Sequence, residues 1–94
     1  MATLITLKEY SVQYNIEPTF LLELEACGII YFQEQDDEKY ISEEQLGELE
    51  RYIRFHYDLD INIEGIDAIR HLLNKVSRLE HEIKMLKNQL HLHQ

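Results

Sequence analysis

The feature that most constrains the fold is a run of apolar residues in the last third of the chain, spaced three and four positions apart. This heptad stripe comprises Ile69, Leu72, Val76, Leu79, Ile83, Leu86 and Leu90. A seven-residue repeat of this kind places one continuous apolar face along an α-helix, which is typical of a coiled coil. Such a face needs a second surface to cover it. The sequence therefore predicts a C-terminal dimerisation helix over residues 63–94, with Asn62 as its cap.

The residue types along the heptad stripe favour a pair of helices. Mostly β-branched residues alternate with leucine along the stripe, and this choice is typical of a coiled coil of two parallel helices. In a parallel pair Lys75 would meet Glu80 of the partner subunit, and Glu82 would meet Lys87. Each charge pair contributes about 0.3 to 0.5 kcal/mol, and each buried stripe residue about 1.5 to 3 kcal/mol. Burial therefore predicts a homodimer, parallel or antiparallel; the alternative is a helix folded back onto its own domain.

The chain is short enough that burial against a second subunit would add substantially to its stability. With 94 residues, of which 45% are apolar, the chain predicts one small globular part over residues 1–62. Chains this short bury a smaller fraction of their surface than larger domains do. Cys27 is the only cysteine, so we expect a packed thiol in a reducing compartment. Since the sequence has neither a long apolar run nor a signal series, it predicts a cytoplasmic protein without membrane contact.

Helix start signals predict two short helices in the first third of the chain. Thr6 and Glu9 have the spacing of a capping box, in which a hydroxyl and a carboxylate bond the free amides of a helix start. They predict a first helix over residues 7–13. Pro18 suits the first position of a second helix and Gly28 its end. The tight turn between the two makes a helix-turn-helix.

Two β-branched and aromatic runs follow, at residues 29–32 and 39–41. The polar stretch between them predicts a small hairpin, or wing. Two strands need a helix behind them, and Ser42 with Gln45 forms a second capping box that opens one. The predicted fold class is mostly α: a winged helix-turn-helix with a small β-hairpin wing and a long C-terminal coiled-coil helix.

No residue pattern in the sequence points to catalysis. The glycines Gly28, Gly47 and Gly65 are isolated, whereas a phosphate-binding loop groups several together. His91 and His93 lack a third nearby ligand and make a poor metal site. No serine or cysteine has a base in a recognisable arrangement. The sequence predicts a protein that is not an enzyme and that holds neither cofactor nor metal.

Charge is unevenly distributed along the chain, whose net charge is −9. Residues 1–65 carry fifteen acids and four basic residues, and residues 66–94 carry three acids and five basic residues. The first two-thirds should attract cationic partners and repel nucleic acid and anionic lipid. Duplex binding with roughly six to ten phosphate contacts requires as many cations on one face. The composition is therefore unfavourable for nucleic acid as a partner.

The order of two short helices, a wing, a third helix and a coiled coil resembles the MerR type of winged helix-turn-helix protein. The resemblance implies that the second helix enters the major groove and that this helix and the wing offer basic residues to the phosphates. In this chain residues 18–26 contain no basic residue, and acids follow them in the wing. Arg51 and Arg54 leave one alternative open, a MerR-type DNA-binding transcriptional regulator.

A narrower resemblance covers residues 42–90. The segment RFHYDLDINIEGI, which runs from Arg54 to Ile66 and precedes the leucine-spaced helix, is similar to CbpM-type chaperone modulators. The resemblance implies that the protein binds the J-domain of a DnaJ-like or CbpA-like co-chaperone and restrains its stimulation of the Hsp70 ATPase. The J-domain surface that faces Hsp70 is basic, which suits an acidic competitor. Capping and a tight turn between helices also explain Asn62 and Gly65 on structural grounds alone.

The predicted partner-binding residues combine acids with one aromatic. They are Glu23, Glu25, Tyr31, Glu34, Asp36, Asp37 and Glu38. Acids at the rim of an interface mainly raise the association rate, and aromatics at its centre carry most of the binding energy. Phe32 and Tyr40 are further candidates for the centre; alternatively, both line the core side of the hairpin.

Overall fold

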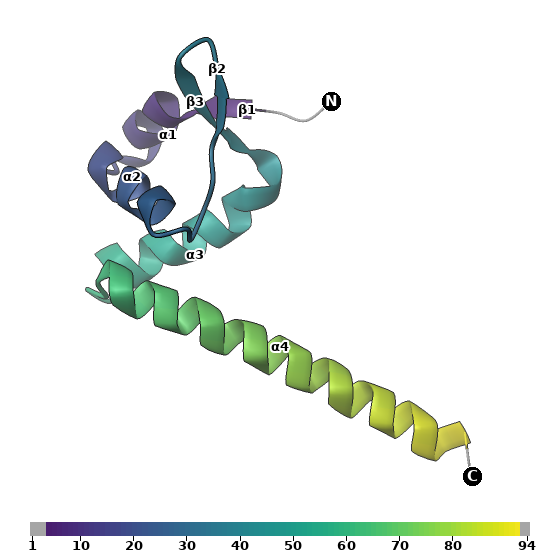
Figure 1. Ribbon diagram of the computed structural model, residues 1–94. Helices are drawn as coiled ribbons and strands as arrows, with labels where there is room; N and C mark the ends of the chain where they lie inside the picture. Colours follow the sequence, from purple (N-terminus) through teal and green to yellow (C-terminus); the bar gives the residue numbers. More distant parts are fainter. Residues whose placement is uncertain (1–3, 93–94) are drawn as a thin grey trace.

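The computed structural model describes residues 4–92, so His93 and Gln94, the last two residues of the helix predicted over 63–94, lie outside the described residues. The elements are β1 (Leu4–Thr6), α1 (Leu7–Tyr14), α2 (Pro18–Ala26), β2 (Gln33–Gln35), β3 (Glu38–Ser42), the 3-10 helix η1 (Glu43–Gln45), α3 (Leu46–Tyr57) and α4 (Ile63–Leu92). Figure 1 shows the three shorter α-helices and the sheet gathered at one end of α4, which projects away from them. We call residues 4–62 the head. The predicted fold, mostly α with a helix-turn-helix, a wing and a long C-terminal helix, is confirmed.

The Thr6 half of the predicted capping box opens α1. The Thr6 hydroxyl oxygen accepts a 3.0 Å hydrogen bond from the backbone N–H of Glu9, a donor with no partner inside the first helical turn. The helix ends at Asn15, whose left-handed backbone (φ 55°) turns its N–H onto the last carbonyls. Pro18 opens α2, and Gly28 (φ 74°) follows its end, both as predicted.

The sheet has three strands, one more than the sequence predicted. The missed strand is β1, which pairs antiparallel with β3 so that Leu4 lies opposite Ser42 and Thr6 lies opposite Tyr40. The order is β1-β3-β2, which makes β3 the central strand. The wing, residues 33–42, is thereby tied to the start of α1.

The prediction of a strand at residues 29–32 was wrong. The outer strand of the wing lies at Gln33–Gln35 instead, where Glu34 is paired with Lys39. Ile29, Ile30 and Phe32 form a buried connection that packs into the core. The side chains of Ile29, Ile30 and Phe32 are buried in the core. The polar residues that follow form the strand β2 instead, and they suit it because all three of its residues are exposed to solvent.

The third helix starts later than its predicted capping box. Ser42 precedes η1, but its side chain makes no capping bond; its hydroxyl oxygen accepts a 3.3 Å hydrogen bond from the Gln45 amide. The buried Gln45 side chain also accepts a 3.2 Å bond from the N–H of Tyr31. This amide therefore holds the buried connection against η1, and α3 begins one residue after it.

The core lies within the head and extends to the first turn of α4. Its fully buried side chains are Tyr10, Leu21, Leu24, Ile41, Leu49 and Ile66. Burial, and then the charge of Glu50, raises the pKa of Tyr10 to about 12. Cys27 was predicted to be packed, and this was wrong: it is exposed where α2 ends, beyond the last core position of that helix.

The corner between α3 and α4 is fixed by a side-chain cap. The Asn62 side-chain oxygen accepts a 2.8 Å hydrogen bond from the N–H of Gly65, as expected of the predicted cap. His56 adds a second tie, since its Nδ1 lies 3.0 Å from the carbonyl oxygen of Ile61. Asp60 lies in the turn between the two helices and has a left-handed backbone (φ 58°). None of the helices within residues 4–92 is long and apolar enough to cross a membrane.

Gly65→Ala should destabilise this corner. The added Cβ would lie 2.7 Å from the Ile61 side chain and 3.1 Å from the capping oxygen of Asn62, so both must move. We expect the free energy of unfolding, measured in urea, to fall by about 1 to 3 kcal/mol. Gly47→Ala is the matched control, because nothing lies within 4 Å of its added Cβ, and helix propensity predicts a gain of about 0.5 to 1 kcal/mol. Equal changes in both variants would contradict this view of the corner.

Candidate protein interfaces

The tip of the wing is a tight turn built from acids. Asp36 and Asp37 join β2 to β3, and both have left-handed backbones (φ 52° and 65°). Two-residue turns of this kind favour Asn-Gly or Asp-Gly, because a side chain disfavours that backbone region. Glu34 and Glu38 flank the turn, and all four carboxylates are exposed. We call these four residues the acidic tip; it concentrates negative charge where the turn itself would favour glycine.

Lys39 links the wing to α2. Its ammonium group donates a hydrogen bond to Glu25 and lies 3.9 Å from a carboxylate oxygen of Glu34. The bond to Glu25 is the main cause that raises the pKa of Lys39. The same ammonium lies 5.9 Å from the centre of the Phe32 ring. The one cation of the wing is thus engaged by two acids of its own chain.

The three candidate aromatics have different environments. Tyr31 is 65% exposed, whereas Phe32 is buried in the core. Phe32 therefore lines the core side of the hairpin and is not available at the centre of an interface. Tyr40 is half-buried, and its hydroxyl donates a 3.3 Å hydrogen bond to Glu38. Burial of Tyr40, followed by the charge of Glu38, raises its pKa. Tyr31 is therefore the aromatic that the head presents most openly.

The structure divides the predicted partner-binding set among several places. The acidic tip is contiguous, and Lys39 joins Glu25 to it. Glu23 lies elsewhere, in a groove between α2 and the start of α4 that Cys27 and Glu64 also line. Tyr31 lies on the buried connection beside Gln45.

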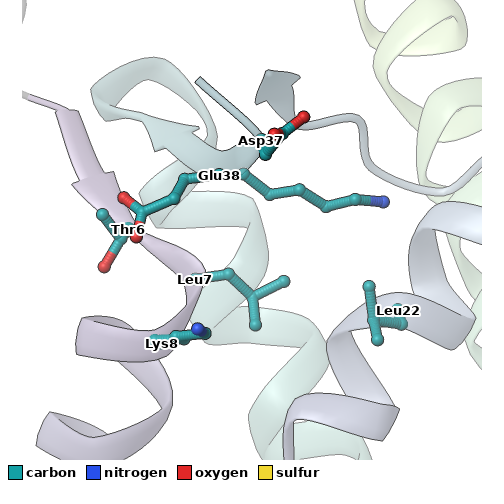
Figure 2. Close-up of a pocket in the computed structure, with 7 residues that line it drawn as sticks. Thr6, Leu7, Lys8, Leu22, Asp37 and Glu38 are labelled. Carbon is teal, nitrogen blue, oxygen red and sulfur yellow. The ribbon is translucent and has the colours of Figure 1, made fainter. Parts of the chain in front are cut away.

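A hollow lies between α1, α2 and the wing. It has a volume of about 180 Å³ and is lined by Thr6, Leu7, Lys8, Leu22, Asp37, Glu38 and Lys39. Figure 2 shows Leu7 and Leu22 on opposite sides of it, with Asp37 and Glu38 on the wing above them and the Glu38 carboxylate next to Thr6. The sequence reading missed Leu22 and Lys8 as surface candidates. A signal existed, since the helical spacing of Leu21 and Leu24 turns the intervening Leu22 outward.

Basic side chains of the head are scattered over several surfaces. α2 has none. Arg51 lines a groove with Arg70 of α4, and Arg54 lines another between α1 and α3. Lys8 lines the hollow from α1, and Lys39 lines it from the wing. Within residues 18–42, which the structure describes throughout, Lys39 is the only basic residue, so α2 and the wing present no band of cations.

The heptad stripe of α4 is not covered by the head. Ile69 is half-buried near the head, and the six later members of the stripe are between 46% and 68% exposed. Figure 1 shows α4 leaving the head rather than folding back onto it, so the alternative of a helix packed on its own domain does not describe this structure. At about 1.5 Å per residue the 30 residues of α4 span about 45 Å.

Comparison with known families agrees with this architecture. The sequence model of the MerR HTH family regulatory proteins matches residues 5–88, which run from β1 through most of α4. None of the curated proteins compared with the chain matches it. The family match covers the helix-turn-helix, the wing and the long helix together. The chain therefore belongs to the MerR helix-turn-helix family of regulatory proteins.

Proposed function

We propose that this chain is a cytoplasmic, non-enzymatic modulator that binds the J-domain of a DnaJ-like or CbpA-like co-chaperone and restrains its stimulation of the Hsp70 ATPase. The observation that carries the proposal is the charge of α2 and the wing. α2 has no basic residue, and Lys39, the one cation of the wing, is bonded to Glu25. This surface offers carboxylates to a basic partner and little to a phosphate.

Electrostatics would act mainly on the rate of capture. An exposed cluster such as the acidic tip steers an oppositely charged surface into contact, and the effect is screened beyond about 8 to 10 Å at physiological salt. Rim charges add less to the final affinity than buried apolar contacts do. Association with a J-domain should therefore be fast at low salt and slow down as salt is added.

The proposal is tested by the ATPase rate of Hsp70 in the presence of a purified DnaJ-like co-chaperone. As the chain is titrated in, the stimulated rate should fall toward the unstimulated rate, because each bound J-domain is withheld from Hsp70. The basal rate without co-chaperone should stay constant, and excess co-chaperone should restore stimulation. A stimulated rate that stays unchanged at saturating protein would refute the proposed restraint.

A MerR-type transcriptional regulator is the second candidate function. It is favoured by the regulatory family to which the chain belongs and by the exposed Arg51 and Arg54. These two arginines line separate grooves, away from the hollow and the wing. If the chain retards mixed genomic duplex DNA in a gel at moderate salt and does not bind a J-domain, this function is favoured over the modulator.

We also propose that the heptad stripe pairs with the same stripe of a second copy to form a homodimer. The support is its exposure along most of α4 and the regular spacing of its seven members. Disulfide capture determines the direction in a Cys27→Ser background. A cysteine in place of Leu72 joins its own copy in a parallel pair. In an antiparallel pair aligned so that Val76 faces Leu79, it joins a cysteine introduced at Ile83 instead.

A further inference from the structure

We propose that the hollow between α1, α2 and the wing receives one long cationic side chain, a lysine or an arginine, from the protein partner. This inference rests on the proposed function and names the contact at its centre. The volume, about 180 Å³, suits a single side chain, because pockets for small molecules occupy about 300 to 1,000 Å³. The hollow lies directly beside the acidic tip, because Asp37 and Glu38 belong to the tip and also line the hollow.

Apolar walls in the hollow match the stem of such a side chain. Leu22 is 40% exposed although Leu21 and Leu24 of the same helix are fully buried, so α2 presents one leucine outward at this place. Leu7 lies on the opposite side of the hollow (Figure 2). Lysine and arginine lay their methylene stems along apolar surfaces and keep the charged head at the polar edge. The two leucines thus fit the stem.

Carboxylates at the wing side match the charged head. Asp37 is exposed, and Glu38 accepts one bond from Tyr40 but keeps further acceptor positions, because an ionised carboxylate has about four. Lys39 also lines the hollow, and its charge is already met by Glu25 and Glu34. An anionic occupant would be repelled by Asp37 and Glu38, the two acids that line the hollow. The sign of the local charge therefore selects a cation.

A substitution at Lys8 tests whether the side chain that enters the hollow is positively or negatively charged. It is exposed on the α1 side of the hollow and repels an incoming cation. Lys8→Gln should therefore tighten binding of a cationic side chain about twofold to threefold, whereas it would weaken binding of an anionic one. A tighter complex supports the inference, and a weaker one overturns it.

The test is calorimetric titration of the full chain with the purified J-domain of a DnaJ-like co-chaperone. Leu22→Ala and Asp37→Asn should each weaken binding roughly threefold to tenfold, because the first removes the apolar wall and the second the charge. Leu59→Ala is the matched control, since this leucine is 64% exposed at the α3–α4 corner and should leave the affinity within about twofold of the native value. Circular dichroism verifies that each variant is folded.

The outcomes separate this inference from the proposed function. If the native chain binds the J-domain and both hollow variants bind equally well, the inference is overturned while the modulator function stands. If the native chain does not bind the J-domain at low salt, the function fails and the inference falls with it. A double-mutant cycle refines a positive result: Leu22→Ala should be non-additive with alanine at one particular lysine or arginine of the J-domain. Additivity with every basic residue would contradict the single-side-chain contact.

Discussion

Leu79→Glu combined with Ile83→Glu should convert the proposed dimer into a monomer while the head stays folded. Both residues lie in the middle of the heptad stripe and are 52% exposed in the single chain, so the monomer tolerates the change. In the dimer, each copy would lose two contacts of about 1.5 to 3 kcal/mol and would bury unpaired carboxylates. The dissociation constant should rise at least about 10⁴-fold. Light-scattering mass at micromolar concentration measures the loss.

His81→Glu combined with Asn88→Glu is the matched control for this variant. These residues are exposed on the opposite side of α4 and add the same two negative charges. The control should remain dimeric. The stripe variant should also lose helical signal in circular dichroism, because the part of α4 beyond the head becomes an isolated helix, which is marginal in water. A native protein that is already monomeric at about 100 μM would contradict the dimer.

Replacing the four acids of the acidic tip by lysine should nearly abolish capture of a J-domain. The replaced residues are Glu34, Asp36, Asp37 and Glu38. The net charge changes from −9 to −1, since each replacement adds two charge units. Steering then turns into local repulsion, so the association rate should fall about 10- to 100-fold at low salt. Stopped-flow fluorescence follows the rate, and high salt should shrink the difference from the native protein.

Two comparisons separate charge from damage to the turn. Lysine at Glu43, Glu44, Glu48 and Glu50, which are exposed on η1 and α3, changes the net charge equally and should slow association much less. Asp36→Asn with Asp37→Gly supplies the residues that a two-residue turn favours, so stability should rise while association slows. If the tip and the η1–α3 variants slow association equally, net charge rather than the acidic tip governs capture.

Local signals in the sequence predicted the starts of α1 and α4, whereas the capping box expected at Ser42 and Gln45 does not form. Thr6 with Glu9, and Asn62 with Gly65, are contacts between residues three positions apart, so residue type and spacing suffice to predict them. The heptad stripe is equally local, because it depends only on the period of one helix. Both classes of feature appear in the structure where the sequence placed them, whereas the pairing of two stripes remains a prediction.

Features that depend on distant residues were missed or misplaced. β1 exists as a strand because Leu4 pairs with Ser42, far along the chain, and its own three residues carry no clear signal. The run at residues 29–32 has strand composition, but burial in the core decides its conformation. The same limit applies to the candidate site: the acids of the wing were predictable, but the ion pair of Lys39 with Glu25 requires the fold. The hollow at Leu22 likewise exists only once the wing lies beside α2.

The central claim is that a MerR-type scaffold with an acidic helix and wing selects a basic protein surface over DNA. The most direct measurement compares the affinity of the native protein for a purified J-domain and for mixed-sequence duplex in the same buffer, over a series of salt concentrations. We predict saturable J-domain binding that weakens with salt, and no duplex binding at protein concentrations that saturate the J-domain. Tighter binding to duplex than to the J-domain, with a salt dependence equivalent to several phosphate contacts, would contradict the account.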